Sequence, residues 1–155
     1  MADIMKSLSH SVVSIAMIML LISGAGSLKQ VLVDGGVSDY IGGLLSQSSL
    51  SPLFLGWLIA AILRICIGSA TVSGLTAAGI VLPLVTGTDV RPELMVLAVG
   101  SGSLICSHVN DTGFWLFKEY FSLSIKDTLK TWTIMETSIG ITGLLGVMIL
   151  SLFVK

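Results

Sequence analysis

The stretch PLFLGWLIAAILRICIGSATVSGLTAAGIVLPLV, from Pro52 to Val85, decides how the chain is organised, because it is apolar throughout and carries a single charge, Arg64. Two apolar arms flank the small residues GSAT, Gly68 to Thr71. An arm of about 14 to 16 residues forms a helix only roughly 21–24 Å long, whereas the hydrocarbon core of a bilayer is about 30 Å thick. Each arm is too short to span a membrane, and the two together are too long for one ordinary span. The stretch therefore predicts a re-entrant hairpin, whose tip near mid-membrane lines a cavity that satisfies the freed backbone groups.

The composition of the whole chain also indicates a membrane protein. Of its 155 residues, 54% are hydrophobic and 11% are charged, whereas a soluble domain carries about 25% charged residues. The uncharged runs are Ser7–Leu28, Ile41–Leu63, Ile65–Thr88, Leu94–Asn110 and Thr137–Val154. Several of them exceed the roughly 18 residues that mark a candidate membrane span. We therefore predict an all-α integral membrane protein with one membrane domain over residues 1–155, and a net charge of −1 indicates no nucleic-acid partner.

The other predicted segments are also apolar runs that are separated by polar residues. We expect a first membrane segment at Ser11–Val33 that contains the Gly-broken polar patch Gly24–Gln30, then a loop with a short interfacial helix at Asp34–Pro52. A later helix should run from Leu94 to His108, break at the sequence NDTG and resume at Phe114–Phe121. The last two predicted segments are an amphipathic interfacial helix at Ser122–Trp132 and a final span at Thr133–Phe153.

Lysine and arginine counts in short loops predict the orientation. The stretch Lys118–Lys130 carries three lysines and should be cytoplasmic. Asp34–Pro52 carries none and Thr86–Glu93 carries only Arg91, so these loops should face outside. Lys6 then lies inside, and the C-terminus lies outside.

The hairpin holds two candidate binding features. A charge at mid-membrane costs at least about 2.5–3.5 kcal/mol on insertion scales. Arg64 therefore needs a buried carboxylate, a carbonyl cluster or an anionic ligand, and a packing ion pair is the alternative to ligand binding. At the tip, the backbone N–H groups of Gly68, Ser69, Ala70 and Thr71 and the positive end of the second arm favour an anion. The alternative is a close helix contact through small residues.

The segment SHVNDTG, Ser107 to Gly113, places polar groups at the expected helix break. Four of its side chains are candidate ligands: Ser107, Asn110, Asp111 and Thr112. Asp111 and His108 are both candidates for proton uptake, because burial shifts such groups into the working pH range. For His108, helix packing is the alternative.

Other polar and reactive residues suggest structural roles. Cys66 and Cys106 lie in apolar runs and are expected to be buried free thiols, and no spacing of metal ligands or catalytic groups indicates a metal site, a cofactor or an enzyme. Lys29 is expected to extend to the interface. The tryptophans should be interface anchors: Trp57, Trp115 and Trp132.

Three strings resemble the gluconate permease (gluconate:H+ symporter) family of bacterial inner membranes. They are GAGSLKQVLVDGGVSDYI, LRICIGSATVSGLTAAGIVLP and SHVNDTGFWLFKEYFSLSIKDTLKTWTIMET. The resemblance extends from about Ala2 to the last span. It implies a fold of two inverted repeats, each with a re-entrant hairpin and a broken helix. The hairpin tip would then lie at Ser69–Thr71 and the break at Asn110 and Asp111.

The resemblance also implies a function. Family members are much longer, and this chain resembles only their C-terminal portion. We expect part of a proton-coupled transporter for gluconate or a related sugar acid, with the substrate carboxylate near Arg64 and the hairpin tip. Ser107, Asn110 and Thr112 would bind the sugar hydroxyls, and Asp111 or His108 would carry the proton. The alternatives are a truncated, non-transporting membrane fragment or a half-transporter that needs the other repeat or a homo-oligomer.

Overall fold

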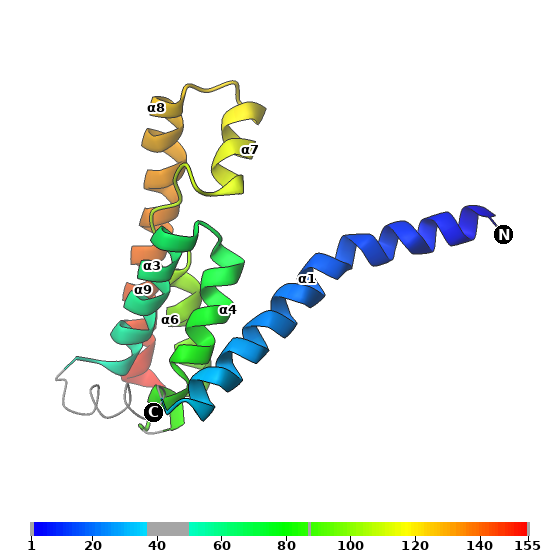
Figure 1. The fold of residues 1–155 in the computed structure, drawn as a ribbon. Coiled ribbons are helices and arrows are strands. Elements are labelled where there is room, and N and C mark those ends of the chain that lie inside the picture. Colours follow the sequence, from blue (N-terminus) through cyan, green and yellow to red (C-terminus); the bar gives the residue numbers. More distant parts are fainter. Residues whose placement is uncertain (1, 37–49, 87, 155) are drawn as a thin grey trace.

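The computed structural model of the chain describes residues 2–36, 50–86 and 88–154. All regular structure in these ranges is helical, in agreement with the predicted class (Figure 1). The elements are α1 (Ala2–Asp34), α3 (Pro52–Ile67), α4 (Ala70–Ile80), α5 (Leu82–Thr86), α6 (Pro92–Gly102), α7 (Thr112–Tyr120), α8 (Ile125–Thr128), the π-helical turn η1 (Leu129–Thr133) and α9 (Ile134–Phe153).

Helices α3 and α4 form an antiparallel pair whose connection is only two residues long (Figure 1). Gly68 ends α3 in the left-handed conformation, with φ 81°, and its N–H donates to the carbonyl oxygen of Arg64 over 2.9 Å. Ser69 then caps α4, because its side-chain oxygen accepts the N–H of Val72. The predicted turn is therefore shorter than expected, since Ala70 and Thr71 already belong to the first turn of α4.

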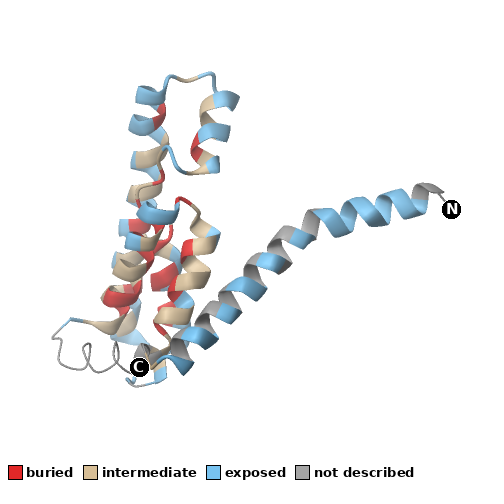
Figure 2. Cartoon of the chain, viewed as in Figure 1, coloured by how far each residue is buried: buried red, intermediate tan, exposed pale blue. Residues whose placement is uncertain are grey.

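The buried core lies where α3, α4 and α6 pack together, with a contribution from α9 (Figure 2). Small residues permit this close packing. A Cβ at Gly102 in α6 would overlap the carbonyl oxygen of Trp57 in α3, and one at Gly140 in α9 would lie 2.6 Å from Ile105 Cδ1. The core residues are Leu53, Leu55, Ala60, Ala77, Val81, Leu94, Met95, Ala98, Val99 and Val147.

Helix α1 contacts α4 near its own C-terminal end and then diverges from the other helices (Figure 1). It continues through Gly24 and Gly26 without interruption, so the polar patch does not break the helix. The predicted interfacial helix between Asp34 and Pro52 lies mostly in residues 37–49, outside the described part of the chain.

The chain from Ile125 to Phe153 forms one helix of 29 residues. Among the described residues it is the one helix long and apolar enough to cross a membrane. The predicted separate interfacial helix Ser122–Trp132 is therefore wrong. Ser124 caps a helix that begins at Ile125, its hydroxyl oxygen accepting the N–H of Asp127 over 3.1 Å, and the helix continues through the π-helical turn η1 into α9.

The break after α6 also begins earlier than the sequence predicts. Helix α6 ends at Gly102 rather than at His108. Hydroxyl groups of Ser101 and Ser103 bond to carbonyl oxygens three residues earlier, and Cys106 adopts a positive φ of 53°, which ends the helical path. Helix α7 then resumes at Thr112, close to the predicted Phe114.

The connection between α7 and α8 lies at one end of the bundle (Figure 1). The open end of the α3–α4 pair, the start of α6 and the C-terminus lie at the opposite end. The lysine-bearing connection and the start of α6 thus lie at opposite ends of the bundle, and the assignment of these ends to the inner and outer side of a membrane stays a prediction.

Candidate functional site

The structure joins the hairpin tip to the helix break through an ion pair. Arg64, in the last turn of α3, is 2% exposed, and its Nη2 donates to Asp111 Oδ2 over 2.6 Å. Its Nη1 donates to the carbonyl oxygen of Gly68. A buried guanidinium requires compensation of this kind, because an uncompensated charge at such a position is costly. Two groups that lie 47 residues apart in the sequence thus form one charged centre.

Asp111 uses both carboxylate oxygens. Oδ1 accepts the backbone N–H of Gly113 over 3.0 Å and so caps α7, while Oδ2 accepts the hydroxyl of Ser107 as well as Arg64. A carboxylate at a helix N-terminus is also favoured by the helix dipole. These contacts fix the carboxylate where the broken chain meets the guanidinium.

Helix α9 and the π-helical turn before it make hydrogen bonds to the segment between α6 and α7. Ser107 is fully buried; its Oγ accepts the indole N–H of Trp132 over 2.7 Å, and its carbonyl oxygen accepts the hydroxyl of Thr133. The N–H of Cys106 donates to Thr137 Oγ1 over 3.1 Å. Sequence reasoning missed Thr133 and Thr137, although their spacing of four residues, next to Trp132, is a signal for one polar helix face.

The three tryptophans, which the sequence predicts to be interface anchors, all use their indole N–H groups within the chain. Trp132 Nε1 binds the break, and Trp57 Nε1 donates to the carbonyl oxygen of Gly140, which joins α3 to α9 over 3.0 Å. Trp115 Nε1 donates to the carbonyl oxygen of Val109 over 2.8 Å. All three therefore make hydrogen bonds within the chain.

Asn110 attaches the break to the end of α3. Its side-chain amide donates to the carbonyl oxygen of Ile65 over 2.9 Å. Its backbone lies so close to Gly68 that a Cβ at that glycine would overlap the carbonyl oxygen of Asn110. The hairpin tip and the break are thus in direct contact, as expected for one shared site.

The structure does not gather all the predicted site residues at this contact. His108 Nδ1 pairs with the carbonyl oxygen of Cys106 over 2.7 Å, within its own segment. The side chains of Thr71 and Thr112 are exposed. Cys66 is exposed and Cys106 half-buried, both as free thiols, so the expected burial of Cys66 is wrong, because its side chain leaves the packed face of α3.

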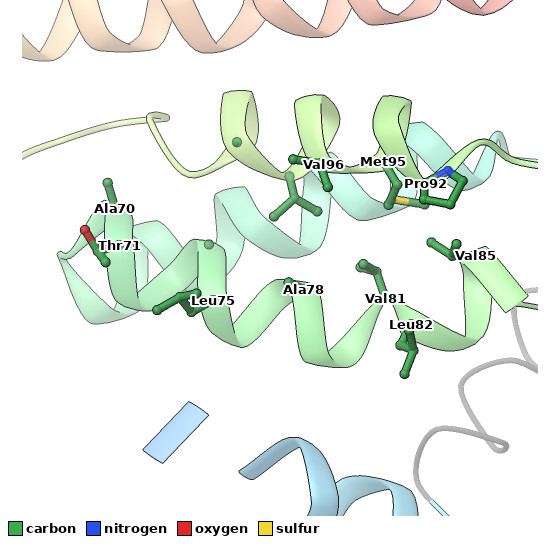
Figure 3. Close-up of a pocket in the computed structure, with 13 residues that line it drawn as sticks. Ala70, Thr71, Leu75, Ala78, Val81, Leu82, Val85, Pro92, Met95 and Val96 are labelled. Atoms are coloured by element: carbon green, nitrogen blue, oxygen red, sulfur yellow. The ribbon is translucent and has the colours of Figure 1, made fainter. Parts of the chain in front are cut away.

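A cavity of about 510 Å³ lies between α4 and α6 (Figure 3). It begins beside the hairpin tip at Ala70 and Thr71 and extends along Leu75, Val81 and Met95. Among the described residues that line it, Thr71 supplies the one polar side chain. Such walls cannot recognise a polar ligand, so the polar chemistry of the described residues is concentrated at the Arg64–Asp111 centre beyond the end of this cavity.

Comparison with known proteins identifies relatives. A family model described as GntP family permease matches residues 1–153. The high-affinity gluconate transporter of Escherichia coli is 53% identical over 154 residues, covering 99% of this chain and 35% of that protein. The Gnt-II system L-idonate transporter of the same organism is 56% identical over 146 residues, covering 94% of this chain and 33% of the transporter.

A gluconate permease of Bacillus subtilis is 54% identical over 151 residues, covering 97% of this chain and 34% of the permease. The chain thus spans about a third of the length of the curated relatives it matches. No solved structure matches it significantly.

Proposed function

The chain belongs to the GntP permease family, a family of membrane transporters rather than enzymes, and from this membership we propose that it is part of a proton-coupled transporter for gluconate or a related sugar acid in the bacterial inner membrane. The relatives named above are described as transporters of gluconate and of L-idonate, which are both sugar acids. One observation in the chain itself carries the proposal. A buried arginine lies where the hairpin tip meets a broken helix, and this is chemistry that suits a carboxylate ligand.

The substrate carboxylate is proposed to bind beside Arg64 and the first turn of α4. A guanidinium presents parallel N–H donors that match a carboxylate. Ala70 and Thr71, the first residues of α4, have backbone N–H groups without an acceptor inside the helix, and Gly68 and Ser69 complete the turn. Substrate and Asp111 then compete for one guanidinium.

The remaining groups at the break are proposed to bind the sugar hydroxyls. Ser107, Asn110 and Thr112 supply hydroxyl and amide groups there, although Ser107 and Asn110 must exchange part of their present hydrogen bonds for substrate. The sequence assigns the coupling proton to Asp111 or His108. Asp111 contacts Arg64 directly, whereas His108 pairs with the carbonyl oxygen of Cys106.

The finer fold is part of the same proposal. Helix α3 has 16 residues, which is about 24 Å at 1.5 Å per residue, shorter than a hydrocarbon core of about 30 Å. We propose that α3 and α4 form a re-entrant hairpin and that α6 and α7 form a broken transmembrane helix. Together they would constitute one of two inverted repeats, and alternating access would move the site against the other repeat.

These 155 residues on their own are proposed to insert into a membrane and to self-associate, since polar groups left in lipid cost several kcal/mol each.

The test is a chimera. This chain replaces the matching third of the high-affinity gluconate transporter of Escherichia coli, and uptake of labelled gluconate is measured in cells that lack their own gluconate transporters. We expect uptake, with competition by unlabelled idonate and not by uncharged glucose. A chimera that reaches the membrane at the level of its parent and takes up no gluconate would contradict the proposed function.

A further inference from the structure

Glu136 is a carboxylate beside the charged centre to which the sequence assigns no role. It lies on α9 four residues after Trp132 and three after Thr133, the two residues that bond to Ser107. On a helix, residues three and four positions apart lie on one face, so Glu136 shares the face of Trp132 and Thr133. Its side chain is half-buried, and the neighbouring residues Trp132 and Thr137 bond to Ser107 and Cys106 in the segment that leads to Asp111.

The two carboxylates differ in their partners. Asp111 accepts hydrogen bonds from Arg64, Ser107 and the backbone of Gly113, and each of these stabilises its charged form. Within the described part of the chain, no hydrogen bond or salt bridge reaches the carboxylate of Glu136. Arg64 Nε is also buried without a hydrogen-bond partner. Among the described residues, the Asp111 carboxylate therefore has hydrogen-bond partners, whereas the Glu136 carboxylate and Arg64 Nε have none.

When both carboxylates are ionised, the centre carries more negative than positive charge. Arg64 contributes one positive charge, and Asp111 and Glu136 contribute one negative charge each, so the ionised cluster carries a net charge of about −1. A half-buried net charge is unfavourable, and protonation of the carboxylate without partners removes it at the smallest loss of hydrogen bonds.

We propose that Glu136 takes up the coupling proton, and that Asp111 is a positioning residue that holds Arg64 in place. The inference rests on the proposed function and specifies the proton carrier of that site. During transport, the Glu136 carboxylate accepts a proton from water on one side of the membrane and becomes a neutral carboxylic acid. It returns this proton to water on the other side of the membrane.

This assignment gives a physical reason for coupling. The empty, ionised cluster carries a charge of about −1, and an anionic sugar acid alone would raise this to −2 in a poorly solvated site. When Glu136 is protonated, the anion restores the original −1. Proton and substrate therefore bind together at constant site charge, which predicts one proton for each sugar acid.

The first test does not depend on transport. The purified chain in lipid nanodiscs is treated at several pH values with a hydrophobic carbodiimide, which adds to protonated carboxyl groups, and modified peptides are identified by mass. We expect modification of Glu136 that decreases as pH rises and little modification of Asp111. The exposed Glu93 and Glu119 are internal controls for the general reactivity of the reagent with surface carboxylates. Modification of Asp111 in place of Glu136, or of neither residue, would overturn the proposal.

The second test uses the chimera described above. Glu136→Gln should still exchange internal for external gluconate but lose accumulation driven by a proton gradient, whereas Glu119→Gln should behave like the parent chimera. Gradient-driven accumulation that survives Glu136→Gln would refute the role of Glu136. If the parent chimera moves no gluconate, the proposed function fails, and the carbodiimide result still decides whether Glu136 binds the proton.

Discussion

Replacing Asp111 with Asn removes the negative charge beside the buried guanidinium of Arg64 and keeps nearly the same shape. Asn is also a good N-cap residue, so the hydrogen bond from Gly113 is retained. The change therefore isolates the ion pair from the cap. Breaking a buried pair by removing one partner costs about 3–5 kcal/mol. The Asp111 side chain is 13% exposed and Arg64 keeps the carbonyl oxygen of Gly68, so we expect the lower end, about 3 kcal/mol.

The assay is unfolding of the purified chain in mixed micelles, in which helix content is followed by circular dichroism as denaturing detergent is added. The double variant Arg64→Met/Asp111→Asn removes both charges and should regain much of the lost stability, with an interaction energy of about 2 kcal/mol. Glu119→Gln is the matched control, because its partner Lys118 forms a surface pair that contributes about 0–1 kcal/mol.

A loss smaller than about 0.5 kcal/mol in Asp111→Asn would be typical of an ordinary surface site. That result would refute the reasoning that Asp111 compensates the buried charge of Arg64. The same holds if the losses of stability in Arg64→Met and Asp111→Asn simply add in the double variant.

Three further predictions follow from the same geometry. Gly68→Ala should destabilise the chain by about 1–3 kcal/mol in the same assay, because φ is 81° and the new Cβ meets the carbonyl oxygen of Asn110. The control Gly146→Ala, which has open space around the new Cβ, should not destabilise the chain. Equal effects of the two changes would count against a strained hairpin tip. Arg64→Lys keeps the charge and loses the planar fork, so gluconate affinity of the chimera should fall about tenfold or more, or about 1.4 kcal/mol; unchanged affinity would favour a packing role. Cysteines at positions 51 and 86 of the chimera, in a background without Cys66 and Cys106, should react with an impermeant reagent from one side of the membrane; labelling from opposite sides would end the re-entrant hairpin.

The hairpin tip could be predicted because its causes are local. Gly68 and Ser69 are a helix stop and a helix start that are adjacent in sequence, and the length of the apolar arms is visible without a structure. The position of Arg64 near the tip follows from the same count. Its partner does not, because Asp111 lies 47 residues away and is brought to Arg64 by the packing of α3 against α6.

The end of α6 and the role of the last helix could not be predicted for a related reason. The uncharged run continues past Gly102 through Ile105, so hydropathy alone extends the helix, and only the serine hydroxyls and the positive φ of Cys106 show where it ends. The lysines of Ser122–Trp132 indicate an interface on one face. The opposite face, with Trp132, contacts the break, and this tertiary contact leaves no mark in the local pattern.

The central claim is that the Arg64–Asp111 centre belongs to a site that moves a sugar acid together with a proton. The most direct measurement is accumulation of labelled gluconate in liposomes that contain the chimera, with an imposed proton gradient. We predict accumulation above the external concentration, which collapses when a protonophore dissipates the gradient and is absent in Arg64→Met. Accumulation that survives the protonophore or the loss of Arg64 would contradict the account.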